Sequence, residues 1–360
     1  MNIIGIVAEF NPLHEGHIDH IKQTRKISGC KHIVVAMSGN FVQRGEPAIV
    51  NKFERTKMAL ENGADIVLEI PVPYVISGAD YFARGSVGLL AATGVVDGLS
   101  FGSEWGCLTE IETAGKILAE EPALYKEVLR TKIDEGMSFA AARGAALATC
   151  LGEIPEGLLT KPNNCLGMEY CKANFLLGKP FEMVTTHRQA GGPSATRLRR
   201  EMPKKITLDD FSDIFKYLLY TSPSVDRLGE GVGNRFRRMG SEYAKISDLL
   251  DAVKTKRYTY TRLQRDVLRV LLNIFEPQMG VQYIRVLGFR KDAEWLVGEI
   301  SRKASLPVIT HGRVIDRLLA DNGAAGKMLA QELSASDIYR VASGEVGGVW
   351  AERGARIIVV

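Results

Sequence analysis

Residues 5–21 read GIVAEFNPLHEGHIDHI, and this stretch joins an apolar run to an amphipathic segment that starts with histidines. The run at residues 3–10 predicts a buried strand, and residues 15–29 predict a helix because their apolar positions recur about every 3.6 residues before a glycine. The first fold unit is therefore a strand, a turn and a helix. A turn of this kind at the carboxyl edge of a parallel sheet is where α/β proteins bind ligands.

The same alternation of strand and helix patterns continues along the chain. Further β-branched runs stand at residues 32–39, 64–72, 95–103 and 181–186, with helical patterns between them. This order predicts an α/β fold with a doubly wound, Rossmann-like parallel sheet. From residue 203 helical periodicity prevails, although the chain closes on the short run ARIIVV. We expect an α/β domain over residues 1–202 and a second, mostly helical domain over residues 203–360.

The composition is that of an ordinary globular protein and argues against several other classes. Of 360 residues 46% are apolar and 24% charged, and no segment approaches the ~18 continuous apolar residues of a membrane helix. The first residues lack the basic region and cleavage site of a signal peptide, and the five scattered cysteines suggest neither a disulfide framework nor a CxxC pair. We expect a cytoplasmic protein with no membrane association.

The histidines after the first strand have the spacing of a phosphate site. His14 and His17 are three residues apart and so face the same side of the first helical turn. Free backbone N–H groups and the helix dipole favour an anion there, and Gly16 lets the backbone approach it closely. A metal site of His14, His17 and His20 is a weaker alternative, because no nearby carboxylate or cysteine pattern completes it. The structural alternative is a surface helix with incidental histidines.

A second motif near residue 194 fits the same chemistry. The pattern HxGH after a first strand is the signature of the nucleotidylyltransferase superfamily, whose late motif has the form S-x-T/S-x-I-R at a helix start. In PSATRLRR, residues 193–200, the matching residues are Ser194, Thr196 and Arg199. Ser194 suits a helix N-cap, and Arg199 offers a guanidinium fork for phosphate. A capped basic helix is the structural alternative.

Longer blocks resemble the bacterial tRNA(Met) cytidine acetate ligase family. They are GIVAEFNPLHEGHIDHI, VAMSGNFVQRGEPAIVNKFERTKMAL, FARGS, FGSE, KPNNCLGMEY, THRQAGGPSATRLR and YIRVLGFR, and they extend from the first residues to about residue 300. The resemblance implies a ligase that activates free acetate with ATP to acetyl-adenylate, releases pyrophosphate, and acetylates N4 of the wobble cytidine of elongator tRNA(Met). ATP is then a co-substrate. The sequence indicates no protein metal site and no oligomeric state, and it leaves a role for Mg²⁺ open.

The resemblance also implies which residues bind ATP. The nucleotide loop falls on residues 7–20, followed by a glycine of FGSE, an asparagine of KPNN, for which Asn163 is preferred to Asn164, and the arginine of HR. The two catalytic residues are His14 and His17, which stabilise charge on the α-phosphate and the leaving pyrophosphate. The ATP-binding candidates, with the late motif included, are Val7, Ala8, Glu9, Phe10, Asn11, Pro12, Leu13, His14, Glu15, Gly16, His17, Ile18, Asp19, His20, Gly102, Asn163, Asn164, Arg188, Ser194, Thr196 and Arg199.

A basic stretch with interleaved tyrosines, KTKRYTYTRLQRDVLR at residues 254–269, suggests an RNA surface. Residues 251–305 hold 11 Lys and Arg against 6 Asp and Glu, whereas the net charge of the whole chain is only +4. Guanidinium and phenol planes stack on the splayed bases of single-stranded RNA such as an anticodon loop. A solvated basic helix face is the alternative. The tRNA-binding candidates are Lys254, Lys256, Arg257, Tyr258, Tyr260, Arg262 and Arg265.

The loop SGNFVQRGEPA at residues 38–48 follows the second strand and carries four polar side chains. They are expected either to face acetate or the tRNA end, or simply to structure the loop. These residues are Ser38, Asn40, Gln43 and Arg44.

Two other functional classes fit parts of the sequence. A small-molecule nucleotidylyltransferase would release pyrophosphate without any tRNA and would not depend on the basic region. A non-catalytic RNA-binding module on the same fold would keep its RNA function when His17 is replaced by alanine.

Overall fold

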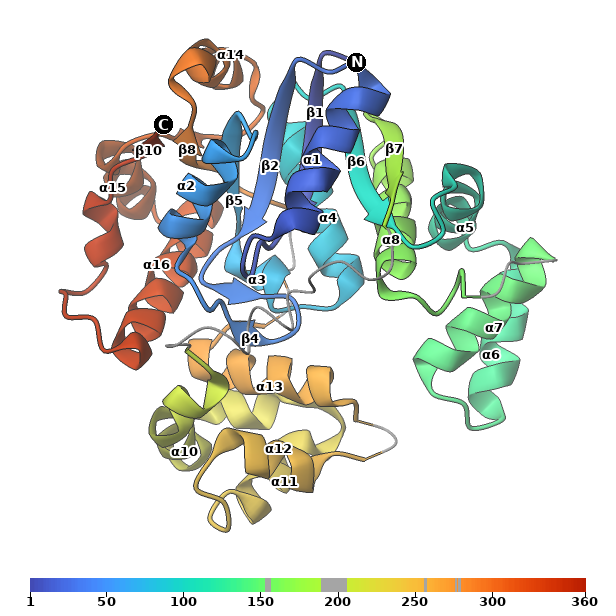
Figure 1. Ribbon diagram of the computed structural model, residues 1–360. Helices are drawn as coiled ribbons and strands as arrows, with labels where there is room; N and C mark the ends of the chain where they lie inside the picture. Colours follow the sequence, from blue (N-terminus) through green and yellow to red (C-terminus); the bar gives the residue numbers. More distant parts are fainter. Residues whose placement is uncertain (153–156, 189–205, 256–257, 276, 278–279) are drawn as a thin grey trace.

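Five parallel strands form the centre of the main sheet and confirm the predicted doubly wound α/β fold (Figure 1). The structure is a computed structural model that describes residues 1–152, 157–188, 206–255, 258–275, 277 and 280–360. The strands are β1 (Ile3–Ala8), β2 (His32–Ser38), β5 (Ile66–Ile70), β6 (Gly98–Ser103) and β7 (Glu182–His187). Their order is β5-β2-β1-β6-β7, so the direction of winding reverses at β1. All five runs expected to be strands are strands in the structure.

Helices cover both faces of this sheet. On one face Ile21 and Leu60 of two helices pack against Ile4 and Ile6 of β1. On the other face a larger core includes Leu90, Leu99 and Met168. Full burial of one such side chain contributes roughly 1.5–3 kcal/mol, which holds the layers together. The helices of this half are α1 (Glu15–Ser28), α2 (Lys52–Glu61), α3 (Val72–Val75), α4 (Ala79–Ala92), α5 (Leu108–Glu120), α6 (Ala123–Asp134), α7 (Phe139–Leu151) and α8 (Pro162–Leu176).

The C-terminal region returns to the sheet, which corrects the expected domain boundary. The strand β8 (Ile284–Phe289) pairs antiparallel with β5, and its neighbours β9 (Val308–Ile309) and β10 (Ile358–Val359) pair parallel with β8. The expected mostly helical domain over residues 203–360 is therefore too long, because YIRVLGFR is a strand of the α/β body. Three helices follow β8 and pack on this body: α14 (Glu294–Lys303), α15 (Gly312–Asp321) and α16 (Ala324–Ser343).

The helical unit proper is shorter and has its own core. It spans residues 206–275 and buries Phe211, Phe215, Phe236 and Leu263 among its helices. In Figure 1 it lies beyond the carboxyl ends of the parallel strands. It touches the loop after β2, which carries a small hairpin of β3 (Phe41–Val42) and β4 (Glu46–Pro47). Its helices are α10 (Ser212–Thr221), α11 (Val232–Met239), α12 (Ile246–Val253) and α13 (Tyr260–Leu272), joined by the short 3-10 turns η1 (Leu208–Phe211), η2 (Pro223–Arg227) and η3 (Gly229–Gly231).

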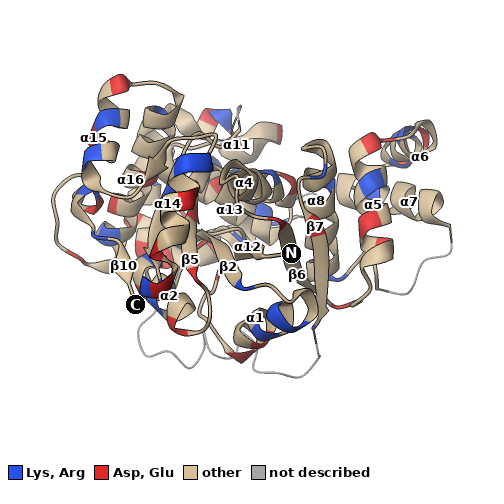
Figure 2. Ribbon diagram, turned by 90° about the horizontal axis from the view of Figure 1, so that it is seen from above, with Lys and Arg blue, Asp and Glu red and all other residues tan. Residues whose placement is uncertain are grey.

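Most of the charged residues lie on the helices around the sheet (Figure 2). In the part of the chain that the structure describes, no helix is both long enough and apolar enough to cross a membrane.

Candidate active site

His14 caps the first helix and is held in one tautomer. It is the N-cap residue of α1, and its Nδ1 accepts a hydrogen bond of 3.1 Å from the backbone N–H of Gly16. The ring proton therefore sits on Nε2, which is a hydrogen-bond donor. A Cβ at Gly16 would come within 3.0 Å of the His14 ring, so glycine is what permits this close cap.

His17 lies stacked on His14 at the same helix start. The ring centroids are 3.7 Å apart, and the ring of Phe10 meets His17 edge-on at 5.1 Å. Burial lowers the pKa of His17 to about 3, and repulsion from a protonated His14 or from Arg188 would act in the same direction. His17 is therefore neutral at pH 7. Its Nδ1 is buried and has no hydrogen-bond partner among the described residues, which is the state expected of an atom that a ligand satisfies.

His20 has a different role, because it ties the helix to the sheet. Its Nδ1 shares a hydrogen bond of 2.6 Å with Thr186 Oγ1 on β7. Burial lowers the pKa of His20 to about 4, and the charge of Arg188 adds to this. Within the described ranges no three His, Cys, Asp or Glu side chains gather closely enough to hold a metal ion. The three histidines are thus one stacked pair and one anchor.

Arg188 lies between the histidines and the residues Gly102 and Asn163. Its side chain passes over Gly102 of β6, where a Cβ would come 3.0 Å from Arg188 Cγ. Its Nη1 donates a hydrogen bond to Asn163 Oδ1 at 3.3 Å, and its charge lowers the pKa of both His17 and His20. The structure therefore brings Gly102, Asn163, Arg188 and the histidines to the carboxyl edge between β1 and β6. This is the point where the strand order reverses and where ligands bind in open α/β sheets.

The two neighbouring asparagines differ in exposure and partners. Asn164 is buried, and its side chain accepts from the N–H of Trp105 at 3.0 Å and donates to the carbonyl of Gly157 at 3.4 Å. Asn163 is half-buried and contacts Arg188 and, at 2.6 Å, Glu104 Oε1. The Glu104 carboxylate also accepts from the N–H of Asn164 at the start of α8. Asn164 is built into the loop, whereas Asn163 borders the site.

Hydrogen bonds to the segment after β2 hold the nucleotide loop, residues 7–20, in place. Phe10, Asn11 and Pro12 are buried, and Asn11 Oδ1 accepts from the N–H of Ile49 at 2.8 Å. Glu9 Oε1 accepts from the N–H of Gln43 at 2.6 Å, and burial raises the pKa of this carboxyl. The exposed residues of the loop are Glu15, Gly16 and Asp19, and the partly exposed ones are Val7, Ala8, Glu9, Leu13, His17, Ile18 and His20.

Five of the predicted site residues cannot be placed. Ser194, Thr196 and Arg199 of the late motif, and Lys256 and Arg257 of the basic stretch, lie outside the described residues.

Known proteins that match this chain over most of its length all point to one family. The family model described as HIGH Nucleotidyl Transferase matches residues 1–203 and 193–348. The tRNA(Met) cytidine acetate ligase of Caldanaerobacter subterraneus subsp. tengcongensis is 36% identical, with 95% of this chain and 96% of that protein covered. The enzyme of the same name from Halothermothrix orenii is 34% identical over 94% of each chain.

The chain belongs to the tRNA(Met) cytidine acetate ligase family. Two solved structures of a member, Thermotoga maritima TmcAL, match it over the full length of both chains with a TM-score of 0.91. One, 28% identical, is bound with alpha-thio ATP, and the other, 27% identical, is the apo form. The resemblance seen in the sequence blocks is therefore confirmed.

The predicted RNA-binding residues that the structure describes differ in their surroundings. Lys254 is exposed, and Arg262 lies 5.5 Å from the ring centroid of Tyr258 and 3.2 Å from Glu230 Oε2. Arg265 instead reaches the loop after β2, where its Nη1 donates to the carbonyl of Gln43 at 3.4 Å. Tyr260 packs against the core of the helical unit, and burial raises its pKa.

The polar residues of the loop after β2 are also divided. Asn40 is buried, accepts from the N–H of Lys52 at 3.0 Å and donates to Ser336 at 3.3 Å, so it structures the loop. Ser38 is fully buried. Gln43 is half-buried and Arg44 is exposed, which leaves these two side chains at the surface.

Sequence reasoning missed a buried charged cluster beside this loop. Lys52 Nζ lies 2.5 Å from Glu69 Oε1 and from Glu352 Oε1, and 3.4 Å from Glu332 Oε1. Arg285 Nη1 lies 3.0 Å from Glu69 Oε2, and each of these side chains is at most 5% exposed. No sequence signal sets them apart, because lysine and glutamate in helices are ordinarily solvated.

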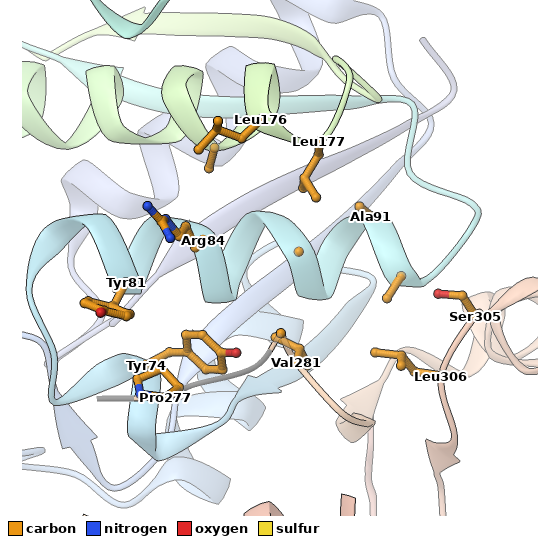
Figure 3. Close-up of a pocket in the computed structure, with 14 residues that line it drawn as sticks. Tyr74, Tyr81, Arg84, Ala91, Leu176, Leu177, Pro277, Val281, Ser305 and Leu306 are labelled. Carbon is orange, nitrogen blue, oxygen red and sulfur yellow. The ribbon is translucent and has the colours of Figure 1, made fainter. Parts of the chain in front are cut away.

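An apolar groove of about 620 Å³ lies along α4, away from the histidines (Figure 3). Leu176 and Leu177 border it on one side, and Val281 and Leu306 on the other. None of the predicted site residues lines this groove.

Proposed function

We propose that the protein joins acetate to tRNA(Met) in two steps at the edge where the histidines, Asn163 and Arg188 meet. In the first step an acetate oxygen attacks the α-phosphorus of ATP, the bond to the β-phosphate oxygen breaks, and pyrophosphate leaves with the electron pair. In the second step the N4 amine of the wobble cytidine of elongator tRNA(Met) attacks the acetyl carbon. The bond from that carbon to AMP breaks, and the amine loses a proton. Membership of the family over 95% of the chain supports this ligase activity.

The observation that carries the proposal is the stacked histidine pair at the start of α1. The Nε2–H of His14 is a fixed neutral donor, because Nδ1 is occupied by Gly16. His17, also neutral, lies beside it at the positive end of the helix dipole. Donors fixed in place before charge develops on the phosphates stabilise the transition state by about 3 kcal/mol each.

Two further groups complete the nucleotide site in this proposal. Arg188 supplies a guanidinium that holds phosphate oxygens, and the bare backbone of Gly102 leaves room for the ribose or the base. Asn163 presents an amide able to read a base edge or a ribose hydroxyl. The bound alpha-thio ATP of the Thermotoga maritima relative supports ATP as the co-substrate. Mg²⁺ commonly binds through substrate phosphates, and no step above depends on a protein metal site.

The tRNA approaches, in this proposal, from the side of the helical unit. That unit lies beyond the carboxyl edge of the strands, which is the edge that carries the histidines (Figure 1). Lys254, Tyr258 and Arg262 lie on it, and their charges and planes suit phosphate and unstacked bases.

Acetate-dependent exchange of labelled pyrophosphate into ATP tests the first step, and transfer of labelled acetate to bulk tRNA tests the second. We expect exchange that needs acetate but no tRNA, and label in RNA only when both are present. Exchange that ignores acetate, with no label in RNA, would instead indicate a nucleotidylyltransferase of another substrate and would overturn the proposal.

A further inference from the structure

Arg55 of α2 is the largest fully buried side chain in the described part of the molecule, and it lies next to the nucleotide loop. Its three nitrogens all donate to backbone carbonyls. Nη1 donates to Glu9 at 2.5 Å, Nε donates to Val50 at 2.8 Å, and Nη2 donates to Gly39. The turn after β1 and the turn after β2 are thus joined by one guanidinium.

A fully buried arginine that binds only backbone carbonyls is energetically unusual. Burial of a cation is unfavourable unless partners compensate for the lost hydration, and among the described residues no ion pair of Arg55 with a carboxylate is seen, although the charges of Glu9 and Glu69 attract it. Burial lowers the pKa of Arg55 to about 10, so the side chain stays charged at neutral pH. An apolar residue would fill the same space without that cost. Only a planar guanidinium can donate hydrogen bonds to the carbonyls of separate turns at the same time.

The residue that follows Glu9 has a conformation that needs such support. Phe10 has φ = 45°, in the left-handed region that bulky residues avoid. Such a backbone persists where its surroundings hold it in place. Here the peptide carbonyl before Phe10 is held by Arg55, and the ring of Phe10 meets His17 at a centroid distance of 5.1 Å.

We propose that Arg55 is a positioning residue for the histidine pair. It acts through the carbonyl of Glu9, the backbone of Phe10 and the ring of Phe10, which sets the plane of His17 and so its stacking on His14. Arg55 reaches neither the phosphates nor acetate in this scheme. The catalytic consequence rests on the proposed function, since it assumes that the pair stabilises the phosphates.

Arg25 offers a matched control. This arginine on α1 also donates to backbone carbonyls, those of Lys31 at 2.5 Å and Gly63 at 2.9 Å, and it pairs with Asp65 at 2.6 Å. These bonds lie at the amino edge of the strands, away from the histidines. Because the Arg25 side chain is 30% exposed and Arg55 is fully buried, the stability of both variants is measured beside their kinetics.

The test is acetate-dependent pyrophosphate exchange by the full chain, with kcat and the KM for ATP measured separately. Misplacement of a reacting group by about 1 Å can cost on the order of 100-fold in rate. We expect Arg55→Ala to lose about that much in kcat with KM for ATP within about twofold, and added methylguanidinium to restore part of the rate. Arg25→Ala should keep the kcat of the unmodified chain.

A second readout is independent of catalysis. In chain labelled at histidine, the ring protons of His17 are shifted by stacking on His14, and in Arg55→Ala this shift should collapse and return with methylguanidinium. If the unmodified chain shows no acetate-dependent exchange, the proposed function fails while this signal still tests the positioning. If Arg55→Ala does not fold, Arg55→Lys keeps the charge without the fork and should show the same loss of kcat. A folded Arg55→Lys with unchanged kcat, or an unchanged His17 signal in folded Arg55→Ala, overturns the proposal.

Discussion

The ring of His17 is stacked on that of His14 with centroids 3.7 Å apart, and the two lie at the first turn of one helix. Two protonated imidazoles at this separation would repel each other, so the arrangement favours neutral rings that donate hydrogen bonds. In the proposed mechanism the pair acts on phosphate charge through its N–H groups and the helix dipole, with no covalent intermediate.

Replacement of either stacked histidine should strongly slow the first step and leave RNA binding in place. We expect His14→Ala or His17→Ala to lower the rate of acetate-dependent pyrophosphate exchange by about 100- to 1,000-fold, the effect of losing one preorganised donor. His311→Ala, at the exposed start of α15, is the control and should exchange normally. Equal loss of tRNA affinity in the His17 variant would show that the two sites are not separate.

Neutral histidines predict a particular response to pH. The pKa of His17 is lowered to about 3 and that of His20 to about 4, mainly by burial. In the unfolded chain both imidazoles take up protons near pH 6.5, so their contribution to stability is complete above that pH and declines as the pH falls toward 4. Nuclear magnetic resonance titration of labelled histidine should find both rings neutral at pH 5.5. A ring that titrates at pH 6 or above, assigned to His17, would contradict the account of the pair.

Replacement of Asn163 and of Asn164 by alanine should have different effects on ATP binding and on stability. Asn163→Ala should raise the KM for ATP by about tenfold, because one hydrogen bond to substrate is lost, with little effect on stability. Asn164→Ala should destabilise the fold by about 1–3 kcal/mol, because the partly buried N–H of Trp105 loses its acceptor. Calorimetry and steady-state kinetics on both variants test this. The reverse pattern would assign ATP contact to Asn164.

The buried charged cluster predicts a pH-dependent stability. Burial and the neighbouring Glu69 raise the pKa of Glu332 to about 8. The carboxyl is thus protonated in the fold while it ionises near pH 4.5 in the unfolded chain, so its contribution to stability is present at low pH and is lost as the pH rises toward 8. Glu332→Gln mimics the protonated form and should flatten this decline.

Glu332→Ala is the informative contrast, because it leaves Lys52 and the N–H of Val72 without a partner they now have. We expect it to destabilise the fold by about 3 kcal/mol at neutral pH. Chemical denaturation at several pH values distinguishes the two variants. A glutamine variant as unstable as the alanine variant would mean that Glu332 is ionised in the fold.

The basic helical unit predicts a salt-dependent contact with RNA. Arg257 and Arg262 changed together to alanine should weaken tRNA binding and reduce its salt dependence, because phosphate contacts release counterions. Arg269→Ala is the comparison, since Arg269 lies on the same helix but its side chain is only 16% exposed, against 33% for Arg262. Filter binding at several salt concentrations measures both quantities. Unchanged affinity and slope in the double variant would place the RNA elsewhere.

Much of the α/β half could be predicted from the sequence, because its signals are local. Most of the parallel strands are short β-branched runs, and helices α1 and α2 are amphipathic and begin at the polar N-caps His14 and Asn51. The histidine pair could be predicted for the same reason, since His14, Gly16 and His17 are neighbours in the chain.

What could not be predicted depends on partners far apart in sequence. The strand β8 lies among helical patterns and finds its partner β5 through Arg285 and Glu69, which are 216 residues apart. Lys52 meets Glu332 across 280 residues. Arg55 stands in a segment that looks like an ordinary amphipathic helix, and its carbonyl partners leave no trace in side-chain patterns.

The most direct test of the central claim is mass spectrometry of the nucleosides of tRNA incubated with the protein, ATP and isotopically labelled acetate. The account predicts N4-acetylcytidine that carries the label, formed only with ATP and acetate and formed far more slowly with His17→Ala. Unlabelled or absent acetylcytidine, from a folded protein that binds ATP, would contradict it.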